Sequence, residues 1–202
     1  MNLYGHPYSG NARRVQMLCE ELGVPYTYEK VDLLGAQQYT PEFQALNPNC
    51  KVPVIDDDGF LLWESQAIMR YLANKHNASS WYPTELRERA RIDQWLDWNQ
   101  TRLTREVGKI AFNTLFAGDK ADTSAIEEGK KNLEKILPVL DAALVDQPYA
   151  CGYKITLADL ALVSNVAYLE MCDYDLIRYP GIKKWYETMK GRPSFTTTAP
   201  KG

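Results

Sequence analysis

The sequence is poor in the residues that bind metals or form disulfides. It has two histidines, and its four cysteines are scattered without any Cys-x-x-Cys pair: Cys19, Cys50, Cys151 and Cys172. A zinc site needs a close set of such ligands, so the sequence predicts no metal site. Isolated thiols of this kind are typical of reduced cysteines in a cytoplasmic protein.

Other absences exclude whole classes of partner. No apolar run approaches the roughly 18 residues that a membrane span needs, and the amino terminus lacks the basic and apolar segments of a secretory signal. The net charge is −3 and no basic run or stripe is present, which argues against nucleic acid as a partner. We therefore expect a cytoplasmic protein that binds neither membranes nor nucleic acid.

The chain is long enough for two small domains, and its pattern changes near the linker that would separate them. Its 202 residues are 45% hydrophobic, enough for a substantial core. Strand and helix patterns alternate over residues 1–76, whereas residues 86–202 show helical periodicity without a convincing strand. The polar, turn-rich residues 77–85 between them predict a linker. We expect a mixed α/β domain followed by an all-helical one.

Within the first domain the order of elements is β-α-β, then a short helix, a hairpin and a closing helix. The predicted elements before the hairpin are a strand at Met1–Tyr4, a helix at Asn11–Leu22, a strand at Val24–Asp32 and a short helix at Pro41–Leu46. This order predicts parallel strands joined by a helix, next to an antiparallel hairpin.

The hairpin at residues 51–65 is the stretch on which the functional prediction depends. Two apolar runs, Val52–Ile55 and Phe60–Leu62, flank an Asp58-Gly59 turn, which is a strong hairpin signal. Pro53 lacks the N–H that a central strand must donate. Either this run is an edge strand, or the proline marks a break with a cis bond where a ligand replaces the missing pairing.

A helix follows the hairpin directly, with Ser65 as its expected N-cap. The first N–H groups of a helix have no partner within it and favour anions. An interrupted strand beside a helix start predicts a site for a short peptide-like anion.

In the helical domain one long helix is predicted from about Glu85 to Gly118, and further helices carry Ile126–Leu144 and Ile182–Met189. Between these two, Thr156 and Asp159 have the spacing of a capping box, which predicts the start of another helix.

Several short motifs together resemble the cytosolic glutathione transferases over nearly the whole chain. These are Asn47-Pro48 with Lys51-Val52-Pro53, Trp63-Glu64-Ser65-Gln66-Ala67-Ile68 with Tyr71-Leu72, Trp81-Tyr82-Pro83, and Ile155-Thr156-Leu157-Ala158-Asp159-Leu160. The resemblance implies a thioredoxin-like amino-terminal domain with a mixed four-stranded sheet, an all-α helical-bundle domain and assembly as a homodimer.

The segment Tyr8-Ser9-Gly10-Asn11-Ala12-Arg13 is most similar to the serine-type classes, theta and delta. Ser9 and Ala12 stand where thioredoxins carry their two cysteines, which argues against disulfide exchange. The resemblance implies that Ser9 donates a hydrogen bond to the sulfur of glutathione and favours its thiolate. Tyr8 and Tyr4 are rival donors, and Ser9 as a plain helix cap is the structural alternative.

The resemblance also implies the residues that bind glutathione. The backbone of Val52, left unpaired by Pro53, is expected to pair with the cysteinyl residue, and Glu64 and Ser65 are expected to hold the γ-glutamyl end. The remaining expected contacts are Lys51 and Gln38 to the glycyl carboxylate, and Asn11 at the mouth of the first helix.

The expected electrophile pocket lies between the Tyr8 loop and the long helix. Its candidate residues are Tyr8, Asn99, Arg102, Arg105 and Phe112. An arginine in such a pocket steadies negative charge that develops on the acceptor.

The predicted activity is conjugation of glutathione to small hydrophobic electrophiles, with glutathione as co-substrate and with neither a metal nor a cofactor. Two alternatives remain open from the sequence. One is a glutathione-dependent dehalogenase or peroxidase that uses the same thiolate, and the other is a carrier or scaffold protein without turnover.

Overall fold

A computed structural model describes residues 1–200, which form two compact units. The first unit combines residues 1–79 with the segment that begins at Arg192, and the second is Ser80–Gly191. The sequence-based division placed residues 86–202 together, but residues 192–200 group with the first unit. The physical reason is a set of hydrogen bonds from Arg192 and Ser194 to Glu21.

The first unit contains the predicted mixed four-stranded sheet. Its strands are β1 (Asn2–Gly5), β2 (Thr27–Lys30), β3 (Val54–Asp57) and β4 (Phe60–Trp63), in the order β2-β1-β3-β4. The pair β1–β2 is parallel, and β3 runs antiparallel to both β1 and β4. The helices of this unit are α1 (Gly10–Leu22), η1 (Gln37–Tyr39), α2 (Pro41–Leu46), α3 (Ser65–Lys75) and α9 (Pro193–Thr197).

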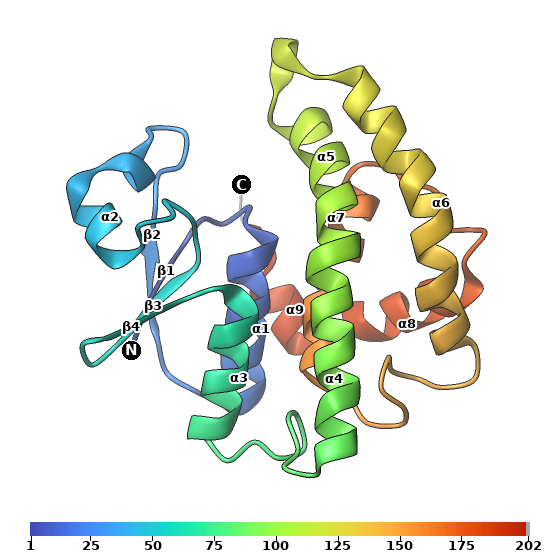
Figure 1. Ribbon diagram of the computed structural model, residues 1–202, viewed down its shortest axis with the longest axis horizontal. Helices are drawn as coiled ribbons and strands as arrows, with labels where there is room; N and C mark the ends of the chain where they lie inside the picture. Colours follow the sequence, from blue (N-terminus) through green and yellow to red (C-terminus); the bar gives the residue numbers. More distant parts are fainter. Residues whose placement is uncertain (201–202) are drawn as a thin grey trace. The chain divides into compact units, whose positions relative to one another are not determined.

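Helices cover both faces of this sheet (Figure 1). Tyr4 and Val54 are register partners, and they share a cluster with Phe43 of α2. Their neighbours Leu3 and Ile55 are also paired and fully buried, and the alternation of a strand turns them to the opposite face, where α1 and α3 lie (Figure 1).

The structure decides between the two readings of Pro53. The strand β3 lies between β1 and β4, so it is not an edge strand. Pro53 precedes its first residue, and the Val52–Pro53 peptide bond is cis. The hairpin turn is also as predicted, because Asp58 and Gly59 both have positive φ angles, 55° and 91°.

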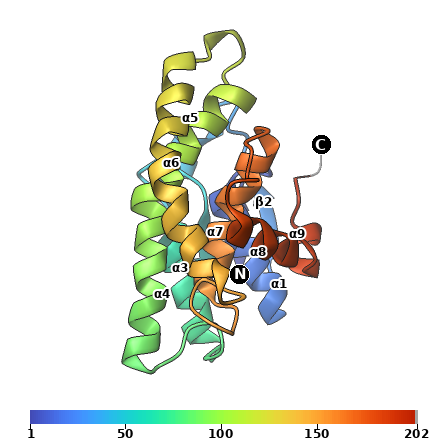
Figure 2. The same cartoon turned by 90° about the vertical axis from the view of Figure 1, so that its right-hand side faces the viewer.

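The second unit is helical throughout its regular elements. They are α4 (Leu86–Trp98), a π-helical turn η2 (Asn99–Leu103), α5 (Thr104–Leu115), η3 (Gly118–Lys120), α6 (Thr123–Val145), α7 (Leu157–Met171) and α8 (Pro180–Lys190). The segments α4, η2 and α5 form the predicted long helix, and α6 runs alongside α5 (Figure 2).

Helix α7 forms the core of this unit. Most of its side chains are buried, and the helix begins with the predicted capping box of Thr156 and Asp159. Over residues 1–200, none of the helices combines the length and the apolar character that crossing a membrane requires.

Candidate active site

The strand register brings the predicted glutathione-binding segments to one end of the sheet. Tyr4 near the end of β1 pairs with Val54, the first residue of β3, and Val54 in turn pairs with Trp63, the last residue of β4. The turn that leads to Ser9, the segment at Val52 and the start of α3 therefore all leave the sheet at this end. The end of β2 lies there too, because Gly5 pairs with Lys30.

Ser9 is the N-cap of α1, with an extended backbone. Its hydroxyl oxygen accepts a hydrogen bond from the Ala12 backbone N–H at 3.2 Å. The hydroxyl proton is not used in this bond, so the same group can cap the helix and donate to a ligand. The capping role is thus present in the structure and does not exclude the catalytic one.

Of the two tyrosines that rival Ser9, Tyr8 contacts His6. The Tyr8 backbone N–H donates to His6 Nδ1 at 3.3 Å, and the two rings lie 5.9 Å apart. Burial, reinforced by the charge of Lys30, lowers the pKa of His6, which favours the neutral imidazole that this bond requires. Tyr8 is 37% exposed, whereas Tyr4 packs against the core cluster.

The loop before β3 is held by Asn47, a residue that the motif analysis did not single out as functional. Its side-chain amide donates to the Lys51 carbonyl at 2.8 Å, and its oxygen accepts from the Asn49 backbone and side chain at 3.0 Å each. Asn47 is 2% exposed, so these bonds are protected from water. An asparagine directly before a proline in a predicted loop is the sequence signal for such a turn, because its side chain bonds the backbone two residues on.

This loop presents two groups that a peptide ligand can use. Lys51 is exposed and forms no ion pair within the part of the chain that the structure describes. Val52 makes no hydrogen bond through its backbone in residues 1–200. An unused N–H and carbonyl beside an exposed ammonium suit an extended peptide with a carboxylate.

The start of α3 differs from the prediction in one respect. The N-cap is Glu64, and Ser65 is the first residue of the helix. Glu64 has φ 70° and ψ 107°, a conformation that a non-glycine residue adopts at a cost in energy. This backbone turns the chain sharply from β4 into α3, so the cap falls one residue earlier than expected.

Glu64 and Ser65 keep their polar groups available. Glu64 is exposed and its side chain caps no backbone N–H. Ser65 is 5% exposed, yet its hydroxyl has no hydrogen-bond partner among the described residues. A carboxylate, a hydroxyl and the first N–H groups of a helix together match an amino acid's ammonium and carboxylate.

Two further predicted contacts, Asn11 and Gln38, lie in segments that follow strands at this end of the sheet. Asn11 follows β1, and Gln38 follows β2. Asn11 is a half-buried residue in the first turn of α1. The Gln38 side-chain nitrogen donates to the Leu33 carbonyl at 3.4 Å, and its oxygen is buried without a partner. In this orientation the Gln38 amide serves its own loop, and its contact with glutathione stays a prediction.

Among the predicted electrophile residues, Asn99 does not fit its role. It is fully buried inside the helical unit, where its oxygen accepts a hydrogen bond from Asn165 at 2.8 Å. Arg102 and Arg105 are exposed, and Arg105 lies 3.6 Å from the Glu106 carboxylate. Phe112 is 61% exposed. Asn99 therefore offers no surface to an acceptor, whereas the other three side chains are exposed and their role stays a prediction.

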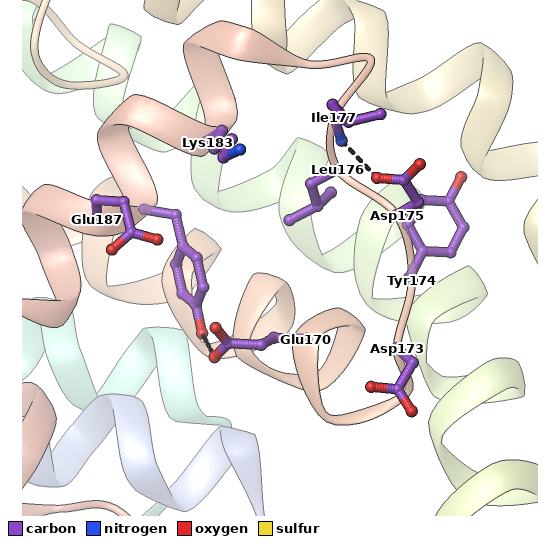
Figure 3. Close-up of a pocket in the computed structure, with 9 residues that line it drawn as sticks. Glu170, Asp173, Tyr174, Asp175, Leu176, Ile177, Lys183 and Glu187 are labelled. Atoms are coloured by element: carbon purple, nitrogen blue, oxygen red, sulfur yellow. Dashed lines mark hydrogen bonds between the residues drawn. The ribbon is translucent and has the colours of Figure 1, made fainter.

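A separate pocket of about 440 Å³ lies within the helical unit between α7 and α8 (Figure 3). Its charged lining is mostly acidic, with Glu170, Asp173, Asp175 and Glu187 against Lys183. The Tyr186 hydroxyl donates to the Glu170 carboxylate at 2.6 Å. The Ile177 N–H donates to the Asp175 carboxylate, as a dashed line in Figure 3 shows. None of the predicted glutathione-binding residues lines this pocket, and Lys190 pairs with Glu170 and Glu187, so the pocket is not the candidate site.

Comparison with known proteins gives two family matches. Residues 8–75 match the model described as the N-terminal domain of glutathione S-transferase, and residues 104–193 match the model of its C-terminal domain. The first match covers every predicted glutathione-binding residue.

Individual relatives align along almost the whole chain. The probable glutathione S-transferase GSTF2 of Oryza sativa subsp. japonica is 31% identical, over 96% of this chain and 93% of the relative. A delta-class glutathione transferase from Nilaparvata lugens is 36% identical with a TM-score of 0.89, over 98% of this chain and 92% of that one. The structure of glutathione S-transferase-I bound with the ligand lactoylglutathione is 30% identical with a TM-score of 0.89, over 98% and 97%.

Proposed function

The chain belongs to the glutathione S-transferase family, and from this premise we propose that it joins the thiolate of reduced glutathione to small hydrophobic electrophiles. The observation that carries the proposal is the set of uncommitted polar groups at one end of the sheet. Lys51, Glu64 and Ser65 have no partner for their side-chain polar groups within residues 1–200, although the surrounding backbone is ordered by hydrogen bonds.

Each of these groups has a counterpart on glutathione. The Val52 N–H and carbonyl pair with the cysteinyl backbone, and Lys51 attracts the glycyl carboxylate. The carboxylate of Glu64 binds the γ-glutamyl ammonium, while the hydroxyl and N–H of Ser65 bind the γ-glutamyl carboxylate. Asn11 and Gln38 complete the set at the start of α1 and in the loop after β2.

The chemical step needs the thiolate form of glutathione. An ordinary thiol has a pKa of about 8.5, so most of it is protonated near neutral pH. The thiol proton passes to solvent water, and the Ser9 hydroxyl donates a hydrogen bond to the resulting thiolate while the N-terminal N–H groups of α1 add positive potential. A decrease of about two pKa units, or roughly 2.7 kcal/mol, leaves most of the bound thiol ionised.

The thiolate then attacks the electrophilic carbon. In a substitution the new S–C bond forms as the bond to a leaving group such as halide breaks, and the electron pair leaves with that group. In an addition the electron pair moves onto the acceptor, which takes a proton from water. Tyr8, Arg102, Arg105 and Phe112 are the exposed candidates for contact with the acceptor.

The test is an ultraviolet titration of the thiolate of glutathione bound to the wild-type protein and to Ser9→Ala. We expect a bound thiol pKa well below that of free glutathione for the wild type. For Ser9→Ala we expect a rise of one to two units, about a 10- to 100-fold loss in the ionised-to-protonated ratio, with binding retained.

A matched control separates catalysis from helix capping. Removal of an N-cap costs about 0.5 to 2 kcal/mol of stability, and Ser9→Ala loses such a cap as well. Asp122→Ala removes the cap of α6, where the carboxylate accepts from Ala125 N–H at 3.1 Å. If the thiol pKa is unchanged in Ser9→Ala, Ser9 only caps the helix, and Tyr8 becomes the candidate hydrogen-bond donor to the sulfur. If the wild-type protein binds glutathione without shifting its thiol pKa, the carrier without turnover is favoured.

We also propose that the protein acts in the cytoplasm as a homodimer and needs no cofactor or metal beyond its co-substrate. Family membership supports this assembly. Light scattering coupled to gel filtration tests it, because a single protomer mass would contradict the dimer.

A further inference from the structure

The carboxy-terminal segment lies along helix α1, the helix that Ser9 caps. Arg192 donates two hydrogen bonds to the Glu21 carboxylate, at 2.7 and 2.6 Å, and the Ser194 hydroxyl donates a third at 2.6 Å. Further along, the Arg13 guanidinium donates to the Phe195 carbonyl at 2.8 Å. The segment therefore holds α1 at two places, near its last turn and near its first.

The contact with Arg13 is the one at the start of α1, one helical turn from Ser9. The Arg13 backbone N–H donates to the Ser9 carbonyl at 2.8 Å, which is the first hydrogen bond of the helix. The guanidinium carbon lies 4.0 Å from the centre of the Phe195 ring. Arg13 is 6% exposed, so its charge is largely removed from water.

We propose that Phe195 is a positioning residue for the thiolate, acting through Arg13. Phe195 holds the Arg13 side chain with its ring and its carbonyl, one helical turn from Ser9. This inference rests on the proposed function, because it concerns the same bound sulfur. It extends that function to a residue near the far end of the chain that contacts no substrate.

Electrostatics gives the reason. A guanidinium stays protonated at any ordinary pH, and a positive charge that is shielded from water favours a nearby anion more than a hydrated one does. The Phe195 ring covers one face of this charge and attracts it as a cation–π contact. Without the ring, water reaches the guanidinium and its side chain gains freedom, so the stabilisation of the thiolate weakens.

The second contact provides an internal comparison. Glu21 is joined by three hydrogen bonds to residues of the same carboxy-terminal segment, but it lies at the opposite end of α1 from Ser9. If the segment only stabilised the fold, weakening either contact would have the same kind of effect. A positioning role predicts that the two contacts differ.

The experiment measures the thiol pKa of bound glutathione and the melting temperature for the wild type, Phe195→Leu, Phe195→Tyr and Glu21→Gln. Leucine keeps a half-buried apolar side chain and the backbone carbonyl at this position but removes the ring. For Phe195→Leu we expect the bound thiol pKa to rise by about half a unit, a roughly threefold loss in the ionised-to-protonated ratio. Phe195→Tyr, which keeps the ring, retains the wild-type value.

Glu21→Gln is expected to lower the melting temperature and to leave the thiol pKa unchanged. A wild-type thiol pKa in Phe195→Leu, or an equal shift in Glu21→Gln, would overturn the positioning role. If Phe195→Leu does not fold, Arg13→Lys tests the same contact, since lysine keeps the charge but loses the planar group that stacks on the ring, and the same rise is expected.

The wild-type titration separates this inference from the proposed function. If the wild type leaves the thiol pKa of glutathione unshifted, the proposed function fails and the positioning role fails with it. If the wild type lowers the pKa and the Phe195 and Arg13 variants match it, only the positioning role is refuted.

Discussion

Two helix starts in this molecule use similar residues in opposite ways. Helix α3 begins at Glu64 and Ser65, and helix α7 begins at Thr156 with Asp159 in its first turn. Each pairs an acid with a hydroxyl residue. At α7 all of these groups are bonded within the protein, whereas at α3 the side chains have no partner within the described residues 1–200.

At the start of α7, the polar groups around Asp159 all have hydrogen-bond partners within the protein. Its carboxylate accepts from the Thr156 N–H and the Ala150 N–H at 2.9 Å each, from the Trp185 indole at 3.1 Å and from the Thr156 hydroxyl at 3.2 Å. Burial raises the pKa of Asp159, and these donors act against that rise. The result is a rigid junction of three segments with nothing left for a ligand.

The two helix starts differ in what their polar groups bond: at α7 the partners lie within the protein, whereas at α3 the groups are left to solvent, and a ligand that binds there replaces water as their partner. The variants below test this difference, from the largest expected effect to the smallest.

Asp159→Asn is expected to have the largest effect. An amide in place of one carboxylate oxygen faces N–H donors with a donor of its own, so at least one hydrogen bond to a charged acceptor is lost and a buried donor is left unpaired. The expected loss is about 3 kcal/mol of unfolding free energy or more. Denaturant unfolding measures it, and Asp122→Asn at the exposed start of α6 is the matched control.

The difference between the two helix starts would be refuted if Asp159→Asn unfolded at the same denaturant concentration as the wild type. In that case the buried carboxylate would contribute nothing beyond an ordinary cap. The side chains at the start of α7 would then contribute no more to the stability of the fold than those at the start of α3.

Ser65→Ala is expected to act on binding and to leave the fold unaffected. Its hydroxyl bonds no described residue, so its removal should change the unfolding free energy by less than about 0.5 kcal/mol. The loss of a hydrogen bond to a carboxylate costs about 1.5 kcal/mol of binding free energy, so the dissociation constant for glutathione should rise roughly tenfold. Calorimetric titration with glutathione measures this.

The reverse result would be informative. A destabilised Ser65→Ala with unchanged glutathione affinity would mean that the Ser65 hydroxyl has a structural partner, and α3 would then resemble α7. Ser164→Ala is a suitable reference for a buried hydroxyl that does have a partner, since its side chain donates to the Ala161 carbonyl at 2.8 Å.

The features that the sequence predicted correctly depend on neighbours close in the chain. The turn at Asp58 and Gly59 and the capping box of Thr156 and Asp159 each form within four residues or fewer, so the residue types alone specify them. The motifs that carry the resemblance are equally local, and the family that they indicated is confirmed by the comparisons.

The features that were missed, or left open between alternatives, depend on residues far away in the chain. The interior position of β3 requires pairing with β1, and the burial of Asn99 requires Asn165 on another helix. The association of the carboxy-terminal segment with α1 requires Glu21 to meet Arg192. No local pattern contains these pairings, because tertiary packing selects them.

The conformation of Glu64 also lacked a sequence signal, and it yields the smallest expected effect. Its φ of 70° is strained for any residue with a Cβ and costs about 1 to 3 kcal/mol. Glycine adopts positive φ freely but loses about 0.5 to 1 kcal/mol through its flexible unfolded state. Glu64→Gly should therefore stabilise the protein by about 1 kcal/mol, measured by denaturant unfolding, while its affinity for glutathione falls.

Glu64→Gln separates strain from charge at this position. Glutamine keeps the strained backbone and loses the carboxylate, so affinity for glutathione should fall without a gain in stability. If Glu64→Gly were no more stable than Glu64→Gln, the strain at the α3 start would be absent. The two helix starts would then differ only in which of their polar groups are paired. If the gain appears, the protein holds Glu64 in a costly conformation to present its carboxylate, which the capping box of α7 never requires of Asp159.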